Sequence, residues 1–359
     1  MKPQNLLKLL GIVFAVIVLL TVLTISSVKT NPGFETIPTL IPEWIIGDLI
    51  LLIISGVAIY FILKNEKKPL VILLELVCFT FLYAAVYVNF ATMAGYYNYG
   101  KALIMILNIP LSIPLIEYVI IYASLRLTNY MKIPTWIKPF IVGISGMIFD
   151  FTLDPVAIKQ VFNTKEGILG RWTWFITSND ANIYGEPVYN FTGWYWFCLI
   201  AAAAILIGRY FYKKSKYNTK YVIYPIISMI VALITLVSPI SRLFLWLEPF
   251  FTKGSIAEWI MLGVHLITPI ILLLIFWKGK MNSKISLKKE YLLPILFIII
   301  HLINIITAII GKYYEIIWLQ LLTGTFHTLM LLIPYYLSKN SPTLTTSRTE
   351  KKNTRELKK

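Results

Sequence analysis

Two aspartates, Asp150 and Asp154, lie near the end of one hydrophobic segment of this 359-residue chain. A charged side chain at the centre of a membrane helix costs roughly 2.5–3.5 kcal/mol on insertion scales, so two of them in one segment require a reason. Because they are four residues apart, a helix places them on one face, one turn from each other. Kept dry, such a pair has the chemistry of a general acid beside a base.

The residues around these aspartates indicate where their face points. Gly146 and Gly143 lie four and seven residues before Asp150, on the same helical face. Small residues let a neighbouring helix approach closely, so we expect this stripe to face the protein interior. Pro155 disfavours helical geometry at Asp154, and we expect the helix to end or kink there. A helix C-terminus and desolvation would both disfavour an ionised Asp154.

Two more acidic residues, Glu75 and Glu117, lie inside other apolar segments. Glu75 is close to one end of its segment, and Glu117 follows Pro110 and Pro114, which interrupt its helix. Ionisable side chains within membrane segments often mark functional sites. Glu75 and Glu117 therefore join the two aspartates as candidate catalytic residues.

A structural role is the alternative for the aspartates. They would then be paired with Asn190, with a tyrosine hydroxyl or with Arg171. Buried polar groups are usually satisfied by such partners. The sequence leaves this choice open.

An aromatic, turn-rich loop follows the aspartates at 158–189. Belts of Trp and Tyr are common at membrane interfaces, so part of this aromatic content is anchoring. The same rings can also line a site for an apolar substrate. The candidate substrate-binding residues are Trp172, Trp174, Tyr184, Asn190 and Trp194.

The elements that must position these residues are membrane-spanning helices. The chain is 58% hydrophobic, and apolar runs of about 20 residues recur along it. We therefore predict an all-α, polytopic transmembrane helix bundle. Its ten predicted spans are 6–28, 44–63, 69–90, 102–125, 139–157, 190–209, 221–240, 256–277, 291–310 and 313–336.

The net charge of +16 reports membrane topology. If the N-terminus is cytoplasmic, most of the 33 Lys and Arg residues fall in cytoplasmic loops and in the tail. This asymmetry is the positive-inside rule, and it predicts both termini on the cytoplasmic side of the cell membrane. We expect attraction to anionic lipid and no nucleic-acid partner.

The remaining reactive residue types favour no cofactor. The histidines, at 265, 301 and 327, have no metal-ligand spacing, and we expect each to be a hydrogen-bonded core residue. Cys78 and Cys198 lie within apolar spans and are expected to be packing residues. No glycine-rich dinucleotide motif follows a strand. We therefore predict no redox cofactor and no metal.

We expect a single transmembrane domain at 1–337, and a disordered, basic cytoplasmic tail at 338–359. The first apolar run is long for a signal peptide and lacks a clean cleavage site, so an uncleaved first span is expected. A second outer segment, 241–255, is expected to lie along the membrane surface.

Several of these residues belong to a pattern that resembles the carotenoid biosynthesis membrane proteins. That family includes the bisanhydrobacterioruberin hydratases and bacterial carotenoid hydratases. The resemblance covers about 70–240, with weaker support from Glu75, from Gly95-Tyr96-Tyr97-x-Tyr99 and from the prolines before Glu117. The chain departs from the pattern at Phe149, where Trp is expected, and at Glu186, where a small apolar residue is expected. The main motifs are Phe149-Asp150-x-x-x-Asp154-Pro155, Trp172-x-Trp174 and Tyr184-Gly185-x-Pro187-x-x-Asn190-Phe191-x-Gly193-Trp194.

This resemblance implies addition of water across a terminal isoprenoid double bond of an acyclic polyene. The residues agree, since protonating a trisubstituted alkene requires an acid held protonated in a dry pocket. Asp150 or Asp154 would be the acid, its neighbour would orient water, and Trp172, Trp174 and Trp194 would stabilise the cation. The expected partners are a lipid-soluble polyene, membrane lipid and other membrane enzymes of the same pathway.

Two other functions remain open at this point. Midplane acids and proline-broken helices also fit a proton- or cation-coupled secondary transporter. An isoprenoid transferase is a further alternative, although the chain has no paired-aspartate pyrophosphate motif. A hydratase needs a lateral opening to lipid because its substrate dissolves in the bilayer, whereas a transporter needs a polar path.

Overall fold

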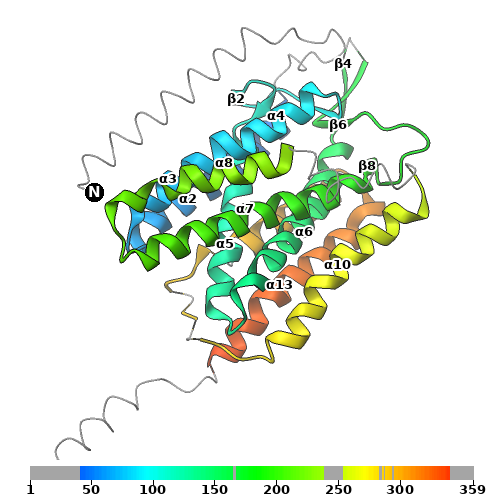
Figure 1. Cartoon of the computed structure of the whole chain (residues 1–359). Helices are drawn as coiled ribbons and strands as arrows, with labels where there is room; N and C mark the ends of the chain where they lie inside the picture. The colour runs from blue at the N-terminus through cyan, green and yellow to red at the C-terminus, as the bar shows by residue number, and fades with distance from the viewer. Residues whose placement is uncertain are drawn as a thin grey trace, which may run out of the picture.

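The computed structural model describes residues 41–164, 167–237, 254–282, 285–286, 288–292 and 295–339, and it is a bundle of helices (Figure 1). The helices are α2 (Pro42–Asn65), α3 (Pro69–Val77), α4 (Ala85–Met93), α5 (Ser112–Tyr130), α6 (Lys138–Lys159), α7 (Val188–Lys214), α8 (Tyr224–Val237), α10 (Ile256–Phe276), α12 (Ile300–Ile310) and α13 (Ile317–Lys339). Two π-helical stretches, Cys78–Ala84 and Ile295–Ile299, lead into α4 and α12.

The predicted all-α fold is confirmed. Within the described ranges, six helical stretches are long and apolar enough to cross a membrane, judged by length and composition. Each predicted span from 44–63 onward overlaps a helix, and the first one, 6–28, lies outside the described residues. The segment 241–255 and the tail 338–359 also lie largely outside them.

The predicted span 102–125 is wrong at its N-terminal end. Residues before Ser112 form a hairpin of β2 (Met105–Ile106) and β3 (Ile109–Pro110), and the helix then continues to Tyr130. The side chain of Asn89, on α4, holds this turn: its Oδ1 accepts from the Asn108 amide at 3.0 Å, and its Nδ2 donates to the Ile106 carbonyl at 3.3 Å. An apolar run alone does not reveal such a tertiary contact.

Helix α6 lies at the centre of the bundle, with 89% of its most apolar stretch buried. It packs closely along α7 (Figure 1). A Cβ atom placed on Gly146 would lie 2.3 Å from Cys198 Sγ, and one on Gly143 would lie 2.9 Å from the Tyr195 carbonyl oxygen. The predicted interior glycine stripe is therefore confirmed, and it determines how near α7 comes to the aspartates.

Of the two outcomes expected at Asp154, a helix end is wrong. Helix α6 passes through Pro155 and ends at Lys159. A proline has no N–H to donate to the carbonyl four residues earlier, which here is that of Phe151. The Gln320 side-chain amide of α13 donates to this carbonyl at 3.5 Å. A side chain of a neighbouring helix thus replaces the hydrogen-bond donor that Pro155 lacks.

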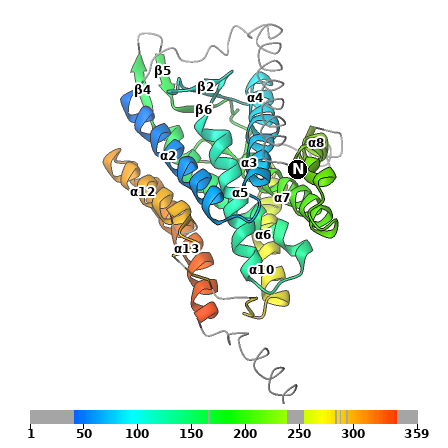
Figure 2. The same cartoon turned by 90° about the vertical axis from the view of Figure 1, so that its left-hand side faces the viewer.

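Short antiparallel strands gather at one end of the bundle (Figure 2). The predicted loop 158–189 contains β4 (Val161–Thr164) paired with β5 (Gly167–Gly170), and β7 (Asn182–Ile183) paired with β8 (Glu186–Pro187). Strand β6 (Trp172–Trp174) pairs with β1 (Tyr97–Tyr99), which lies far earlier in the sequence. This pairing brings aromatic residues from two distant segments together.

Replacing Gly146 by Val tests the contact between α6 and α7. Overpacking a close helix contact costs about 1–3 kcal/mol, so we expect a lower thermal midpoint in detergent. Gly56→Val on α2 is the matched control, because a Cβ there meets nothing within 4 Å. Equal midpoints for the two variants would contradict this account of the contact.

Candidate functional site

Three carboxyl groups meet around one amide between α6 and the start of α7. Asn190 Nδ2 lies 2.9 Å from Asp150 Oδ2, 3.3 Å from Asp154 Oδ2 and 2.6 Å from Glu186 Oε1. One oxygen from each of the three acids lies within 4.8 Å of the others. We call Asp150, Asp154, Glu186 and Asn190 the carboxyl cluster.

Local structure explains how the cluster assembles. The spacing of four residues in α6 aligns Asp150 with Asp154. Glu186 lies in β8, just before α7, and the side chain of Asn190 in the first turn of α7 reaches back to it. The tight turn between β7 and β8 has positive φ at Tyr184 (55°) and at Gly185 (92°), which returns the chain toward α6 at Glu186. Glycine adopts such a φ at no steric cost.

No basic side chain compensates the cluster in the described part of the chain. The five ion pairs found there use other acids, and Arg171 is paired with Asp48. Asp150 Oδ1 and Glu186 Oε2 are buried without a hydrogen-bond partner. Burial raises the pKa of Glu186 well above its ordinary value, and the nearby Asp150 and Asp154 raise it further.

Such a cluster needs positive charge from one of two sources. Carboxyl groups this close can share protons, as paired catalytic aspartates do. Their oxygens are also ligands that a hard divalent cation accepts. The first arrangement stores protons beside a cavity, and the second would hold a metal.

A cavity of about 450 Å³ adjoins the cluster. Asp154 and Asn190 lie in its wall, whereas Asp150 and Glu186 are fully buried and are not among its lining residues. Asp154 is therefore the acid of the cluster that a cavity ligand can reach. The other two acids lie behind it.

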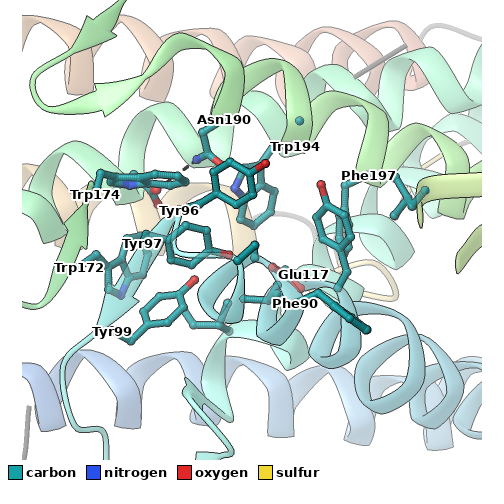
Figure 3. A pocket seen from close by; sticks show the side chains of 18 of the residues that line it. Phe90, Tyr96, Tyr97, Tyr99, Glu117, Trp172, Trp174, Asn190, Trp194 and Phe197 are labelled. Carbon is teal, nitrogen blue, oxygen red and sulfur yellow. Dashed lines mark hydrogen bonds between the residues drawn. The ribbon is translucent and has the colours of Figure 1, made fainter. Parts of the chain in front are cut away.

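Glu117 of α5 lines the same cavity, on the side opposite Asn190 and Trp194 (Figure 3). Its side chain is 3% exposed, and its Oε2 has no hydrogen-bond partner. The cavity thus has a carboxyl group on each of two walls.

Aromatic rings form much of the remaining wall. The β1–β6 register sets Tyr97 opposite Trp174 and Tyr99 opposite Trp172. The ring centroids of these pairs lie 4.3 Å and 5.5 Å apart. Trp194 completes the wall from α7 (Figure 3). Aromatic faces of this kind attract positive charge.

One wall of the cavity reaches the outer surface of the bundle. Phe90 of α4 and Ala94, which follows α4, line it, and Phe90 is 58% exposed. Leu233 and Leu236 of α8 line it as well. Among the described residues, the cavity wall therefore includes part of an apolar outer surface.

The family profile described as carotenoid biosynthesis protein matches residues 47–252, more than half of the chain. The chain belongs to this family. The suspected resemblance is confirmed at that level, and the match extends beyond the expected 70–240. No curated protein and no solved structure matches the chain.

The matched residues of this carotenoid biosynthesis protein include the whole carboxyl cluster and every aromatic residue of the cavity wall. The helices α10, α12 and α13 lie beyond residue 252. The site therefore lies within the part of the chain that the family profile matches. The C-terminal helices pack against that part from outside the match.

Most of the candidate site residues come together in this family member. Those that line the cavity are Glu117, Asp154, Trp172, Trp174, Asn190 and Trp194. Asp150 lies behind Asp154 in the cluster. Of the partners considered for the aspartates, Asn190 is hydrogen-bonded to both, whereas Arg171 is paired with Asp48.

Two candidates lie elsewhere. Glu75 is fully buried, and its carboxylate accepts from Arg209 at 2.5 Å and from the Tyr118 and Tyr224 hydroxyls at 2.8 Å. Tyr184 donates its hydroxyl to the Glu315 carbonyl at 2.6 Å. Neither residue lines the cavity. Their contacts support a structural role.

Sequence reasoning missed Glu186 as a member of the site. The available signal was its departure from the family pattern, together with its spacing of four residues from Asn190. Tyr97, Tyr99 and Tyr189 were also missed as lining residues. Nothing local in the sequence indicates that β1 pairs with β6.

The histidines are hydrogen-bonded core residues, as predicted. His265 Nδ1 lies 2.7 Å from the Met261 carbonyl oxygen. His301 and His327, on different helices, meet at 2.7 Å between Nε2 and Nδ1. Cys78 and Cys198 are buried and free, which confirms their packing role.

Glu186→Gln tests the electrostatics of the cluster. Because the pKa of Glu186 is raised in the folded state, folding favours its protonated form, and its contribution to stability falls as pH rises above the ordinary glutamate value of about 4.3. Glutamine keeps an acceptor for Asn190 but cannot ionise. We expect the thermal midpoint of the variant, relative to that of the wild type, to rise as the pH increases from 4 toward neutral. A pH-independent difference between the two proteins would argue against a buried, protonated Glu186.

Arg209→Met tests whether Glu75 is structural. Removing one partner of a buried ion pair costs about 3–5 kcal/mol, so we expect strong destabilisation in detergent unfolding. Lys159→Met is the control, since Lys159 and Glu315 form an exposed pair at 2.9 Å, and exposed pairs contribute little to stability. Equal, small effects would remove the basis for the structural role.

Proposed function

We propose that this protein is a membrane hydratase that adds water across a terminal isoprenoid C=C bond of an acyclic polyene. The observation that carries the proposal is Asp154, an acid backed by two further carboxyl groups and facing an aromatic cavity at the lipid-facing surface. Membership of a carotenoid biosynthesis family supports the substrate class. A location in the cell membrane and contact with other membrane enzymes of the pathway belong to the same proposal.

Asp154 serves as the general acid in this mechanism. Its carboxyl proton is transferred to the less substituted carbon of the terminal double bond, and the π electrons form the new C–H bond. The other carbon becomes a tertiary cation. Asp150 and Glu186, joined to Asp154 through the Asn190 amide, hold the cluster's protons away from water until a substrate is bound.

The aromatic wall stabilises this cation. Trp172, Trp174 and Trp194 come from two different elements and face the same space. A cation over an aromatic face gains about 2 kcal/mol or more where water is excluded. Each ring also provides apolar surface for the polyene.

Glu117 serves as the general base. Its carboxylate orients a water molecule whose oxygen attacks the tertiary cation, and it accepts the proton that the water loses. A tertiary alcohol results. Return of that proton from Glu117 to Asp154 across the cavity completes the cycle, so no proton is gained or lost overall.

The lateral position of the cavity favours this function over a transporter. Its wall consists mainly of aromatic and aliphatic side chains, with Glu117, Asp154 and Asn190 as the carboxyl and amide groups. A solute path across the membrane requires polar groups along its length. A hydrophobic substrate entering from lipid requires the arrangement seen at Phe90.

Expression in a host that accumulates acyclic polyenes, followed by mass spectrometry of the pigments, tests the proposal. We expect a product heavier by one water that carries ¹⁸O when the cells grow in labelled water. Asp154→Asn and Glu117→Gln should each lower the hydration rate by about 10²–10⁴-fold, the usual contribution of a general acid or base. Asp180→Asn, in the exposed loop and outside the site, is the matched control.

Full activity of Asp154→Asn in correctly inserted protein would overturn this assignment. Loss of wild-type activity in a chelator, restored by a divalent ion, would instead favour a metal held by the carboxyl cluster. An unchanged pigment profile, together with ion flux in proteoliposomes, would favour the transporter.

A further inference from the structure

A second cavity, of about 90 Å³, lies between α2, α6 and α12 at the end of the bundle that carries the strands. Its polar lining residues are Glu43, Gln160, Arg171, Asn304 and Thr307. A cavity needs only about 10–15 Å³ to hold one water molecule, so this one has room for several. Its size and polar groups do not suit a polyene.

Asn304 shows that this cavity requires a polar ligand. The residue is 7% exposed, and its Nδ2 has no hydrogen-bond partner. A buried amide without a partner is destabilising, and an ordered water molecule commonly satisfies such a group. The cavity supplies the 2–4 polar groups that a buried water needs.

Arg171 holds the polar side of the cavity in place. Its guanidinium donates to Gln160 Oε1 at 3.2 Å and to Asp48 Oδ1 at 3.4 Å. It also lies directly over Gly47, where a Cβ would come within 2.6 Å of Nη1. Glu43, one turn nearer the end of α2, is exposed. A charged, hydrated mouth of this kind admits water and disfavours lipid chains.

The two cavities share part of their walls. Leu153 and Trp172 line both of them. Leu153 immediately precedes Asp154, and Trp172 belongs to the aromatic wall of the first cavity. The two cavities are therefore neighbours, and these two side chains contact both.

We propose that the second cavity is a water-binding site that supplies the water consumed in the first cavity. The supply role rests on the proposed hydratase function, whereas the binding of water does not. The arrangement separates the two reactants. The polyene enters from lipid beside Phe90, and water enters from the polar end of the bundle beside Arg171.

Cysteine labelling tests for water in the cavity independently of activity. Full-length Asn304→Cys, in sealed right-side-out and inverted membrane vesicles, is treated with a charged, membrane-impermeant thiosulfonate. The cysteine thiolate attacks the sulfenyl sulfur of this reagent, which forms a mixed disulfide and releases a sulfinate; the thiolate forms in water and is suppressed in hydrocarbon. We expect Asn304→Cys to be labelled from one side of the membrane. The wild-type protein should stay unlabelled, because Cys78 and Cys198 are buried.

Ile306→Cys is the matched control, because Ile306 is on the same helix two residues away and is 52% exposed on the apolar surface. We expect it to react at least about tenfold more slowly than Asn304→Cys. If Asn304→Cys does not fold, Thr307→Cys samples the same cavity. Labelling of neither cavity position above the rate of Ile306→Cys would overturn the water site.

The supply role is then measured on pigment hydration. The thiosulfonate adduct at Asn304→Cys should abolish most product formation, and Ile306→Cys treated in the same way should keep it. Full activity of the labelled variant would overturn the supply role. Labelling without any hydrated product from the wild-type protein would instead overturn the hydratase function and leave the water site established.

Discussion

The burial of three carboxyl groups around the Asn190 amide is the constraint on which the rest of the structure depends. Such a cluster is tolerable only if protons or a cation neutralise it and its oxygens have partners. Helices α6 and α7 must therefore approach closely, which Gly143 and Gly146 permit. The β7–β8 turn must also deliver Glu186 to the same point. These requirements fix the geometry from which Asp154 faces the cavity.

Much of this architecture could be predicted from local sequence. Apolar runs located the helices, and a spacing of four residues correctly set Asp150 and Asp154 on an interior face with the glycines. Contacts between distant segments could not be predicted. Asn89 hydrogen-bonds the hairpin that replaces the start of the predicted span 102–125. Gln320 donates to the carbonyl that Pro155 leaves free in α6. Arg209 forms an ion pair with Glu75. In each case a side chain far away in sequence overrides the local preference.

The site shows the same division. Its aspartates, Glu117 and tryptophans have sequence signals because each is unusual in its segment. Glu186 and the tyrosines of β1 are of residue types that are common in loops, so their residue type alone did not mark them as site residues. Only the pairing of β1 with β6 makes Tyr97 and Tyr99 part of the cavity wall. Strand pairing between distant segments has no periodicity to reveal it.

The hydrogen bond from Gln320 to the Phe151 carbonyl has a consequence for how the family can vary. The proline and the carbonyl that it frees lie within residues 47–252, whereas the amide that compensates lies outside them. In this chain, α13 therefore satisfies a backbone carbonyl in the part that the family profile matches. A relative with the same proline but without this helix would need another donor for that carbonyl, such as water or a different side chain. Residues 47–252, joined alone to a foreign membrane anchor, would have the Phe151 carbonyl without the Gln320 donor.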